Sequence, residues 1–326
     1  MGRRGKVRIG VAGGASIAVR RMLPAMARHP DVEIAAVASR DPAKADRIAA
    51  QFGCRAATGY SSLLTDGGVD ALYVPLPAAL HGEWAERALR AGKHVLGEKP
   101  LTTDPAHTRR ILAEAASRRL TVFENVMFVH HSRHATVREL VAGGAIGRLR
   151  AFRSCFSIPG LPDGDIRYRA DLGGGSLFDV GLYPVRAALH FLGAGLRVTG
   201  AVLSTGDRTV DTSGAVLLEA PGGVVAQLTF GMEHHYQSGY ELLGSTGRIC
   251  VDRAFTPPAD LPTEIVLETS GGVRRIPCPP DDQAANTLTA FAAAVATGSG
   301  ADAACLDQAD LLEAVRRAAA PLSAAA

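Results

Sequence analysis

The sequence predicts an α/β fold in two parts, a doubly wound parallel sheet followed by an α+β domain with an open, largely antiparallel sheet. Up to about residue 125, short apolar runs alternate with helical patterns, which is typical of a parallel sheet with crossover helices. A glycine turn directly follows the first apolar run. Beyond about residue 126, strand-like segments succeed one another with few helices between them, which favours antiparallel pairing. We therefore expect domains at residues 1–126 and 127–326.

Composition argues against several classes of protein. The 326 residues, 47% of them hydrophobic, suffice for two domains with cores. A net charge of +3, from 35 Lys and Arg against 32 Asp and Glu, argues against nucleic-acid and membrane partners. The five cysteines form no C-x-x-C pair, and neither a signal-peptide core nor an apolar run of about 20 residues occurs. We expect a cytoplasmic protein without a zinc site or disulfides.

The first element is a buried strand over Val7–Ala12 that runs into a glycine turn and then a helix pattern. This is the Rossmann arrangement for a dinucleotide, because a helix N-terminus points free amides and a positive dipole at the diphosphate. Against G-x-G-x-x-G, Ala15 takes the second place, and its methyl group predicts a less close approach to phosphate. The residues expected to bind here are Gly13, Gly14, Ala15, Ser16 and Ile17.

The following elements continue the alternation of a parallel sheet. Each expected strand is short and apolar, and each expected helix carries an apolar face. The expected strands are Ile34–Val37, Ala71–Val74, Val95–Gly97 and Thr121–Phe123, and the expected helices are Ala43–Phe52, Glu83–Ala91 and Pro105–Arg118.

The end of the second strand predicts the choice of cofactor. A protein using NAD usually places an acid there, whereas this chain has Ser39 and Arg40, with Lys44 one helical turn on. A hydroxyl and a planar guanidinium suit a 2′-phosphate, so we favour NADP(H). The alternatives are an NAD-binding role for Asp41, or a helix start with charges that only face solvent.

Polar residues also follow the later strands, where ligands gather in such sheets. Glu98 and Lys99 end an apolar run and precede a proline. An ammonium held there can serve proton transfer to a carbonyl, although most such pairs are solvated surface charges. Leu76, Pro77 and His81 follow the third main strand, and a histidine that opens a helix is more often a cap than a ligand contact.

The second domain begins with a helix and continues as a sheet. Asp179 and Tyr183 lie four residues apart in its middle helix region, so a helical segment would point both the same way. The expected helices are Ser132–Val141, Leu182–Phe191, Leu288–Val295 and Leu306–Ala318, and the expected strands are Leu149–Phe156, Val198–Leu203, Ala215–Glu219, Val224–Phe230, Tyr240–Leu243 and Ile265–Glu268.

Three motifs in this order carry a family resemblance: the glycine turn, Glu98-Lys99-Pro100, and Gly173–Tyr183. Together they resemble the glucose-fructose oxidoreductase/inositol dehydrogenase/rhizopine catabolism (Gfo/Idh/MocA) family over most of the chain. Within it, the segments Gly13–Arg21, Val74–His81 and Met127–Ser132 are similar to sugar-nucleotide 3-ketoreductases of antibiotic deoxysugar biosynthesis. In that branch an alanine at the second glycine place is expected.

The resemblance implies an NADP-binding N-terminal domain, oligomer contacts through the C-terminal sheet in a homodimer or homotetramer, and an active site between the domains. It implies NADPH-dependent reduction of the C3 ketone of a dTDP-linked 3,4-diketo-2,6-dideoxyhexose. Lys99, Asp179 and Tyr183 match the family's lysine, acid and histidine-or-tyrosine.

Reduction of a ketone needs a hydride on carbon and a proton on oxygen. We expect Tyr183 to donate the proton and Lys99 to favour the phenolate electrostatically, with Lys99 as direct donor the alternative. Glu98 is expected to fix the lysine or the nicotinamide environment, Asp179 to orient a sugar hydroxyl or the lysine, and His81 to touch the nicotinamide ribose.

A histidine cluster lies where the second domain begins. His130 and His134 share a helix face, but the H-E-x-x-H glutamate is missing, so we expect no metal. We expect polar lining for a sugar nucleotide and its diphosphate instead, and ordinary surface positions are about as favoured for each residue. The residues assigned to this lining are His131, Arg167, Arg169 and Tyr236.

Two other functions stay open. Dehydrogenases of free sugars or inositols usually carry histidine at the Tyr183 place and often an acid at the Ser39 place, so both residues count against that function. The family also includes non-catalytic dinucleotide-binding sensors. The presence of Lys99, Asp179 and Tyr183 together argues against a sensor.

Overall fold

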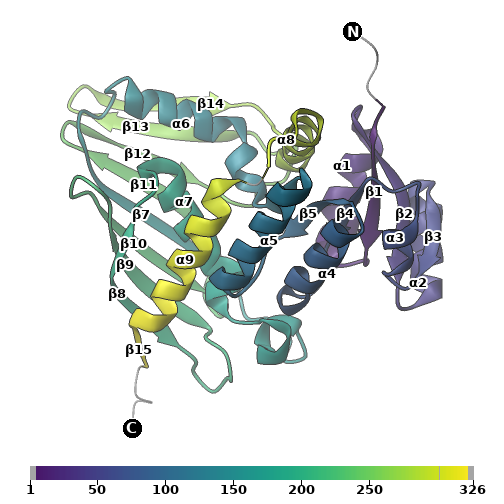
Figure 1. Ribbon diagram of the computed structural model, residues 1–326. Coiled ribbons are helices and arrows are strands. Elements are labelled where there is room, and N and C mark those ends of the chain that lie inside the picture. Colours follow the sequence, from purple (N-terminus) through teal and green to yellow (C-terminus); the bar gives the residue numbers. More distant parts are fainter. Residues whose placement is uncertain (1–4, 301, 322–326) are drawn as a thin grey trace. The chain divides into compact units, whose positions relative to one another are not determined.

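The computed structural model describes residues 5–300 and 302–321 and divides them into two compact units. The first unit takes residues up to 126 together with 284–305, and the second takes 127–283 with the residues from 306 on (Figure 1). The first unit is therefore discontinuous in sequence, because the chain returns to it after the second unit's sheet.

The first unit is built on a six-stranded, all-parallel sheet with strand order β3-β2-β1-β4-β5-β6. The order reverses between β1 and β4, which is the switch point where doubly wound sheets bind ligands. The predicted parallel sheet is confirmed. Its strands are β1 (Val7–Ala12), β2 (Val32–Ser39), β3 (Arg55–Thr58), β4 (Ala71–Val74), β5 (His94–Glu98) and β6 (Val122–Asn125).

Local signals explain where the helices of this unit begin and end. Asp41 caps α2 by accepting from the Lys44 amide, Pro42 takes its first position, and Gly53 ends it with φ +66°. A π-helical turn, Ala18–Met22, precedes α1. The helices are α1 (Leu23–Arg28), α2 (Pro42–Phe52), α3 (Ser62–Thr65), α4 (Ala78–Arg90), α5 (Pro105–Arg118) and α8 (Gln283–Thr297).

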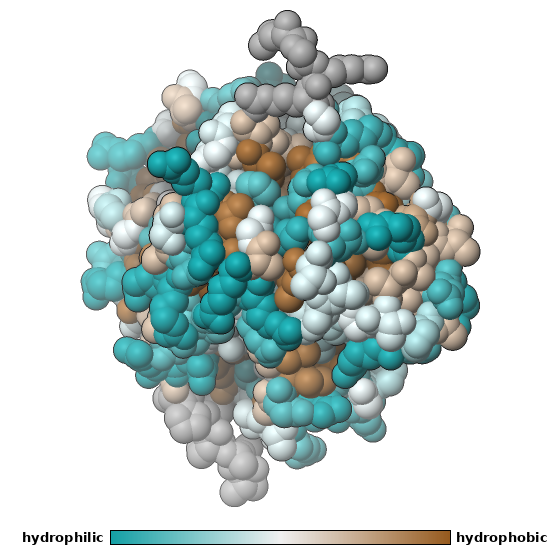
Figure 2. Space-filling view, turned by 45° about the vertical axis from the view of Figure 1, so that its right-hand side comes forward, coloured by the Kyte–Doolittle hydropathy of each residue, from teal (hydrophilic) through white to brown (hydrophobic). Residues whose placement is uncertain are grey.

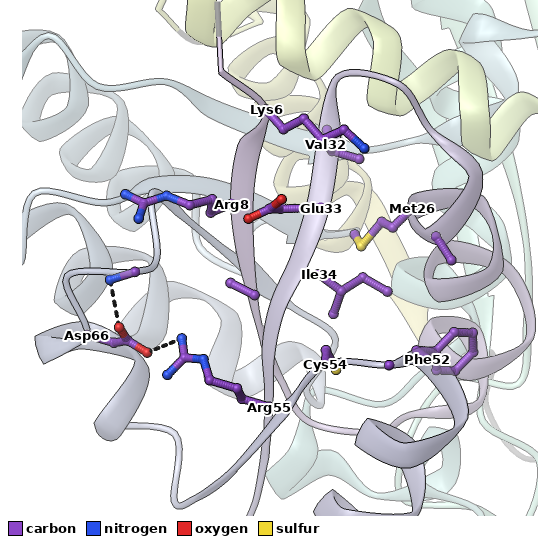
Figure 3. A pocket seen from close by; sticks show the side chains of 14 residues that line it. Lys6, Arg8, Met26, Val32, Glu33, Ile34, Phe52, Cys54, Arg55 and Asp66 are labelled. Carbon is purple, nitrogen blue, oxygen red and sulfur yellow. Dashed lines mark hydrogen bonds and ion pairs between the residues drawn. The ribbon is translucent and has the colours of Figure 1, made fainter.

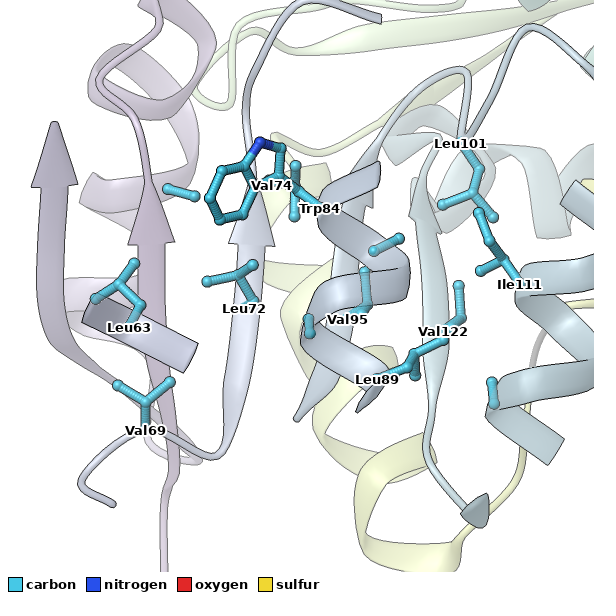
Figure 4. Close-up of a cluster of buried hydrophobic side chains, with 14 of the residues drawn as sticks. Leu63, Val69, Leu72, Val74, Trp84, Leu89, Val95, Leu101, Ile111 and Val122 are labelled. Carbon is cyan, nitrogen blue, oxygen red and sulfur yellow. The ribbon is translucent and has the colours of Figure 1, made fainter. Parts of the chain in front are cut away.

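The core of the first unit lies between the sheet and its helices, as Figure 4 shows. Leu72, Val74 and Val95 of the central strands pack with Trp84 of α4 and Ile111 of α5, and all five side chains are buried. Burial on both faces explains why these strands are continuous apolar runs in the sequence. The edge strand β3 was not predicted, because three of its four residues are exposed and give no apolar pattern.

The second unit is built on a nine-stranded sheet with order β14-β13-β12-β11-β7-β10-β9-β8-β15. Most neighbours are antiparallel, as predicted, while β10 pairs parallel with β7 and β15 parallel with β8. The sequence pattern missed β12 and the largely exposed β14. The strands are β7 (Leu149–Ser157), β8 (Arg197–Ser204), β9 (Ser213–Glu219), β10 (Val225–Gly231), β11 (Gln237–Gly244), β12 (Gly247–Asp252), β13 (Thr263–Thr269), β14 (Gly272–Cys278) and β15 (Ala319–Pro321).

One face of the second sheet is covered and the other is open. Phe152 and Leu228 point to the covered face, where α7 packs on β7 and β10. On the open face, Leu217, Val225 and Leu243 keep between 36% and 41% of their surface exposed. The helices of this unit are α6 (Ser132–Ala142), α7 (Leu182–Leu192) and, from residue 306 on, α9 (Ala303–Ala318).

The molecular face in Figure 2 is mainly hydrophilic, with apolar side chains in small separate patches. Across residues 5–300 and 302–321, every helix is too short or too polar to cross a membrane.

Candidate active site

The glycine turn after β1 lies at the carboxyl edge of the first sheet. Gly13 has φ +119°, which residues with a side chain rarely adopt, and a Cβ there would lie 3.2 Å from Leu76 Cδ2. The turn after β1 therefore lies against the loop that follows β4. Helical structure starts at Ser16, so the amides of Ser16 and Ile17 are in the first helical turn. Such amides lack intrahelical acceptors and suit a phosphate.

Gly14 brings helix α2 close to this turn. A Cβ on Gly14 would overlap Ile48 Cδ1 and would lie 3.0 Å from Lys44 Cε and 3.7 Å from Lys44 Nζ. The missing side chain thus leaves room for Lys44, whose ammonium lies over the glycine turn. A cation at this position adds to the attraction of the helix N-terminus for phosphate.

The end of β2 fits a 2′-phosphate. The buried Ser39 hydroxyl accepts the Asp41 amide at 3.1 Å and keeps its own O–H to donate, and Arg40 is exposed. The Asp41 carboxylate accepts the Lys44 amide at 3.3 Å, so it serves as the cap of α2. The end of β2 therefore offers a hydroxyl and a guanidinium, and Lys44 adds an ammonium near Gly14. These donors fit NADP(H) better than NAD(H).

Glu98 ends β5 in a buried hydrogen-bond network. Its Oε1 accepts from Tyr73 Oη at 2.6 Å and from Asn125 Nδ2 at 2.7 Å. Glu98 is 7% exposed, Tyr73 is fully buried, and Lys99 follows as a half-buried residue with a cis bond to Pro100. The predicted pair Glu98 and Lys99 is thus not a solvated surface pair.

His81 joins two of these loops. Its Nε2 lies 2.6 Å from the Leu76 carbonyl oxygen, its Nδ1 lies 2.7 Å from the Pro100 carbonyl oxygen, and the ring is 2% exposed. Burial is the main cause that lowers the pKa of His81. Both ring nitrogens face main-chain oxygens, and a neutral ring donates to one of the two, so we assign His81 to positioning the Leu76-Pro77 loop and the Lys99-Pro100 turn rather than to contact with a ribose.

In the second unit, Asp179 and Tyr183 lie on one continuous helical segment. Asp179 is in the π-helical turn Leu177–Gly181, and Tyr183 is the second residue of α7. Asp211 holds the start of this segment, because its Oδ2 accepts from Ser176 Oγ at 2.6 Å and from the Leu177 amide at 2.7 Å. The helical expectation for this segment is therefore met, with a π-turn where the sequence pattern predicted none.

Three aromatic rings pack around the side chain of Tyr183. Its ring centroid lies 4.9 Å from that of Phe156, 5.5 Å from that of Phe255 and 6.0 Å from that of Phe128. Tyr183 is 9% exposed. These rings fix the phenol in orientation, and a fixed phenol can act as a proton donor.

The two arginines expected to meet a diphosphate are paired with carboxylates. Arg167 donates to Asp179 Oδ2 at 2.7 Å and to Asp165 Oδ1 at 3.1 Å. The charge of Asp179 is the largest cause that raises the pKa of Arg167. Arg169 pairs with Asp171 at 2.5 Å on the surface. We therefore assign Arg167 to holding Asp179, while contact of the two arginines with a diphosphate stays a prediction.

The histidines at the start of α6 lie in the interior. His131 is 2% exposed, and its Nδ1 accepts the Arg133 amide at 3.3 Å as the cap of α6. His134 is fully buried between Tyr240 Oη at 2.8 Å and the Ala254 carbonyl oxygen at 3.2 Å. We assign His131 to capping rather than to substrate contact. Among the residues that the structure describes, no group of His, Cys, Asp and Glu is arranged to hold a metal.

Tyr236 is half-buried beside this region and stays a candidate for substrate contact. The Arg253 guanidinium lies 5.6 Å from its ring centroid, and Arg253 itself has φ +47°. Buried Arg133 donates to the carbonyl oxygens of Asp252 and Arg253, which fixes this unusual conformation.

These buried histidines make stability depend on pH. Burial and the charge of Arg133 lower the pKa of His131 to about 4, and burial lowers that of His134 well below its usual 6.5. As the pH falls, these histidines are protonated in the unfolded chain before they are protonated in the folded protein. The unfolding free energy should therefore fall by about 2 kcal/mol between pH 6.5 and pH 4. Urea unfolding across this range measures it. His131→Asn keeps a capping acceptor and should flatten the dependence, whereas an unchanged slope would contradict the assignment.

A hollow lies at the opposite, amino edge of the first sheet (Figure 3). It measures about 950 Å³, and both arginines that line it are paired, Arg55 with Asp66 at 2.6 Å and Arg8 with Asp70 at 2.6 Å. Ligands of doubly wound sheets bind at the carboxyl edge, so this hollow is not the candidate site.

Sequence reasoning did not find Tyr73, Asn125 or Asp211. Tyr73 lies inside an apolar strand and reads as core, and Asp211 lies in a loop far along the chain from Ser176. Asn125 carried a usable signal, since it is a polar residue at the end of the last parallel strand, where ligands gather.

Comparison with known families and proteins agrees with this geometry. Residues 7–126 match the sequence model described as an oxidoreductase family with an NAD-binding Rossmann fold, and residues 134–250 match the GFO/IDH/MocA C-terminal domain. The dTDP-3,4-didehydro-2,6-dideoxy-alpha-D-glucose 3-reductase of Saccharopolyspora spinosa is 53% identical, over 91% of this chain and 90% of the relative. The enzyme of the same name from Streptomyces violaceoruber is 52% identical, over 96% and 95%.

A solved structure is similarly close. A 3-ketoreductase from Actinomadura kijaniata, in complex with NADP and TDP-benzene, superimposes with a TM-score of 0.94 at 48% identity, covering 97% of this chain and 99% of that one. Structures of that enzyme include variants with one tyrosine replaced by phenylalanine and one lysine replaced by alanine.

Proposed function

Because the chain belongs to the Gfo/Idh/MocA oxidoreductase family, we propose that it is an NADPH-dependent 3-ketoreductase. Its substrate is a dTDP-linked 3,4-diketo-2,6-dideoxyhexose, whose C3 ketone it reduces to a hydroxyl group in the biosynthesis of antibiotic deoxysugars. The observation that carries the proposal is the similarity of about half of all residues, over nearly the whole chain, to relatives with this named activity.

Different residues of this chain have different roles in the reaction. NADPH, when bound, supplies the hydride for the ketone carbon. Ser39, Arg40 and Lys44 hold its 2′-phosphate, and the turn at Gly13 receives its diphosphate. Tyr183 donates the proton to the ketone oxygen, and Lys99 supplies the positive charge that favours the phenolate left behind. Arg167 holds the Asp179 carboxylate in place, and Asp179 orients a hydroxyl group of the sugar.

The test is NADPH consumption, followed by absorbance, with the diketo sugar nucleotide generated in place by a dehydratase. We expect turnover with NADPH well above that with NADH, and NMR of the product should show a new hydroxyl at C3. A protein that binds NADPH yet turns over none of this substrate, while oxidising a free sugar or inositol, would overturn the proposal in favour of a free-sugar dehydrogenase. Binding without any turnover would favour a sensor.

Arg40 provides a test of cofactor choice. Arg40→Ala removes the guanidinium that pairs with the 2′-phosphate, so the preference for NADPH over NADH should fall by about tenfold or more. The dissociation constants of both cofactors, from their fluorescence, measure this preference. Arg47→Ala, which removes an exposed arginine of the following helix α2, is the matched control. Equal preference ratios in the two variants would contradict the assignment.

We also propose a homo-oligomer, a homodimer or homotetramer, formed through the open face of the second sheet. Val225 and Leu243 flank Ala151 on neighbouring strands of that face, and they remain partly exposed in the single chain. Light scattering should give a multiple of 33.9 kDa. Leu217→Asp with Leu243→Lys should shift the protein toward monomer, whereas a monomeric parent protein would rule the interface out.

The cysteines support a reducing cytoplasm as the location of the protein. All five are free thiols. Burial raises the pKa of Cys54 and Cys278, which lowers their reactivity as thiolates.

A further inference from the structure

Three side chains from three neighbouring strands meet at one carboxylate oxygen. Tyr73 of β4 and Asn125 of β6 both donate to Glu98 Oε1 of β5, at 2.6 Å and 2.7 Å. All three residues are at most 7% exposed. This buried network lies at the carboxyl edge of β4, β5 and β6, the second half of the sheet.

The two hydrogen bonds fix the orientation of the Glu98 carboxylate. Burial, and then the charge of Glu98, raise the pKa of Tyr73 well above its ordinary value of 10, so Tyr73 remains a phenol that donates. Because both donors use Oε1, Oε2 accepts no hydrogen bond from the residues that the structure describes.

The side-chain oxygen of Asn125, Oδ1, has no hydrogen-bond partner within the described part of the chain. The amide nitrogen of Asn125 must face the carboxylate, which turns Oδ1 away, and Oδ1 is buried. A buried acceptor that makes no hydrogen bond destabilises the fold, so this oxygen calls for a partner from outside the chain, such as a bound ligand. Together with Glu98 Oε2, the ends of β5 and β6 present two acceptors and one negative charge.

A fixed anion acts differently on the two forms of a nicotinamide cofactor. The ring is cationic in NADP⁺ and neutral in NADPH, and the second half of a doubly wound sheet takes the nicotinamide half of a dinucleotide. On the basis of the proposed function, we propose that Glu98, held by Tyr73 and Asn125, makes this site favour the oxidised form over the reduced one. Glu98 thereby assists loss of the hydride, since positive charge grows on the ring during that step.

The ratio of two dissociation constants tests this role without using activity. The constant for NADPH is measured from its fluorescence, and that for NADP⁺ by competition. Glu98→Gln keeps the shape and removes the charge, so binding of NADP⁺ should weaken about tenfold relative to NADPH. Tyr73→Phe and Asn125→Leu each remove one hydrogen bond to Oε1 and should shift the ratio in the same direction by less.

Glu124→Gln is the matched control, because Glu124 is another buried glutamate, on β6, and accepts the Leu101 amide at 2.9 Å. Its ratio should equal that of the parent protein. If Glu98→Gln changes both constants equally, the inference is overturned and Glu98 only supports the architecture. If Glu98→Gln fails to fold, an unchanged ratio in Tyr73→Phe overturns it. A parent protein that binds neither form would instead overturn the proposed function.

Discussion

Replacing Tyr183 by phenylalanine should lower kcat by about 10²- to 10⁴-fold, because it removes the hydroxyl that donates the proton to the ketone oxygen. The ring contacts of Tyr183 with Phe156, Phe255 and Phe128 do not need that hydroxyl, so the fold should be unchanged. Single-turnover absorbance of NADPH measures the chemical step, and the dissociation constant of NADPH should equal that of the parent protein.

Tyr240→Phe is the control for this variant. Tyr240 lies in the same unit and forms a hydrogen bond with His134 in the interior, so losing its hydroxyl should lower stability but leave kcat within about twofold of the parent value. A fully active Tyr183→Phe enzyme would transfer the role of proton donor to Lys99.

Replacing Lys99 by alanine should lower kcat by about 10²- to 10³-fold while NADPH still binds. The reason is electrostatic, since an ammonium at the carboxyl edge stabilises the negative charge that develops as the proton leaves the donor. Stopped-flow absorbance gives kcat, and NADPH fluorescence gives the dissociation constant.

Two further variants test this role, one that keeps the charge at position 99 and one that removes a lysine elsewhere. Lys99→Arg keeps the positive charge and should recover part of the activity, because charge rather than proton donation is the assigned role. Lys6→Ala removes an exposed lysine at the opposite edge of the first sheet and should retain full activity. Equal loss in Lys99→Arg and Lys99→Ala would favour direct proton donation by the lysine.

Features that depend on neighbours along the chain could be predicted from the sequence alone. The spacing of apolar residues predicted the parallel sheet and the later antiparallel sheet. This works because the pattern of a strand follows from the faces that it buries. The glycine turn and the Ser39-Arg40 pair predicted NADP(H), which the comparisons support, because turn geometry and phosphate chemistry are local properties. The three motifs in their order predicted the family.

Which side chains meet could be seen only in the folded protein. Tyr73 and Asn125 reach Glu98 from 25 and 27 residues away, and Arg167 reaches Asp179 from 12 residues away. The return of residues 284–305 to the first unit was likewise visible only in the folded protein. The physical reason is that hydrogen bonds and burial depend on distance in space, which strand order and helix packing set, whereas residue type and spacing fix only the local conformation.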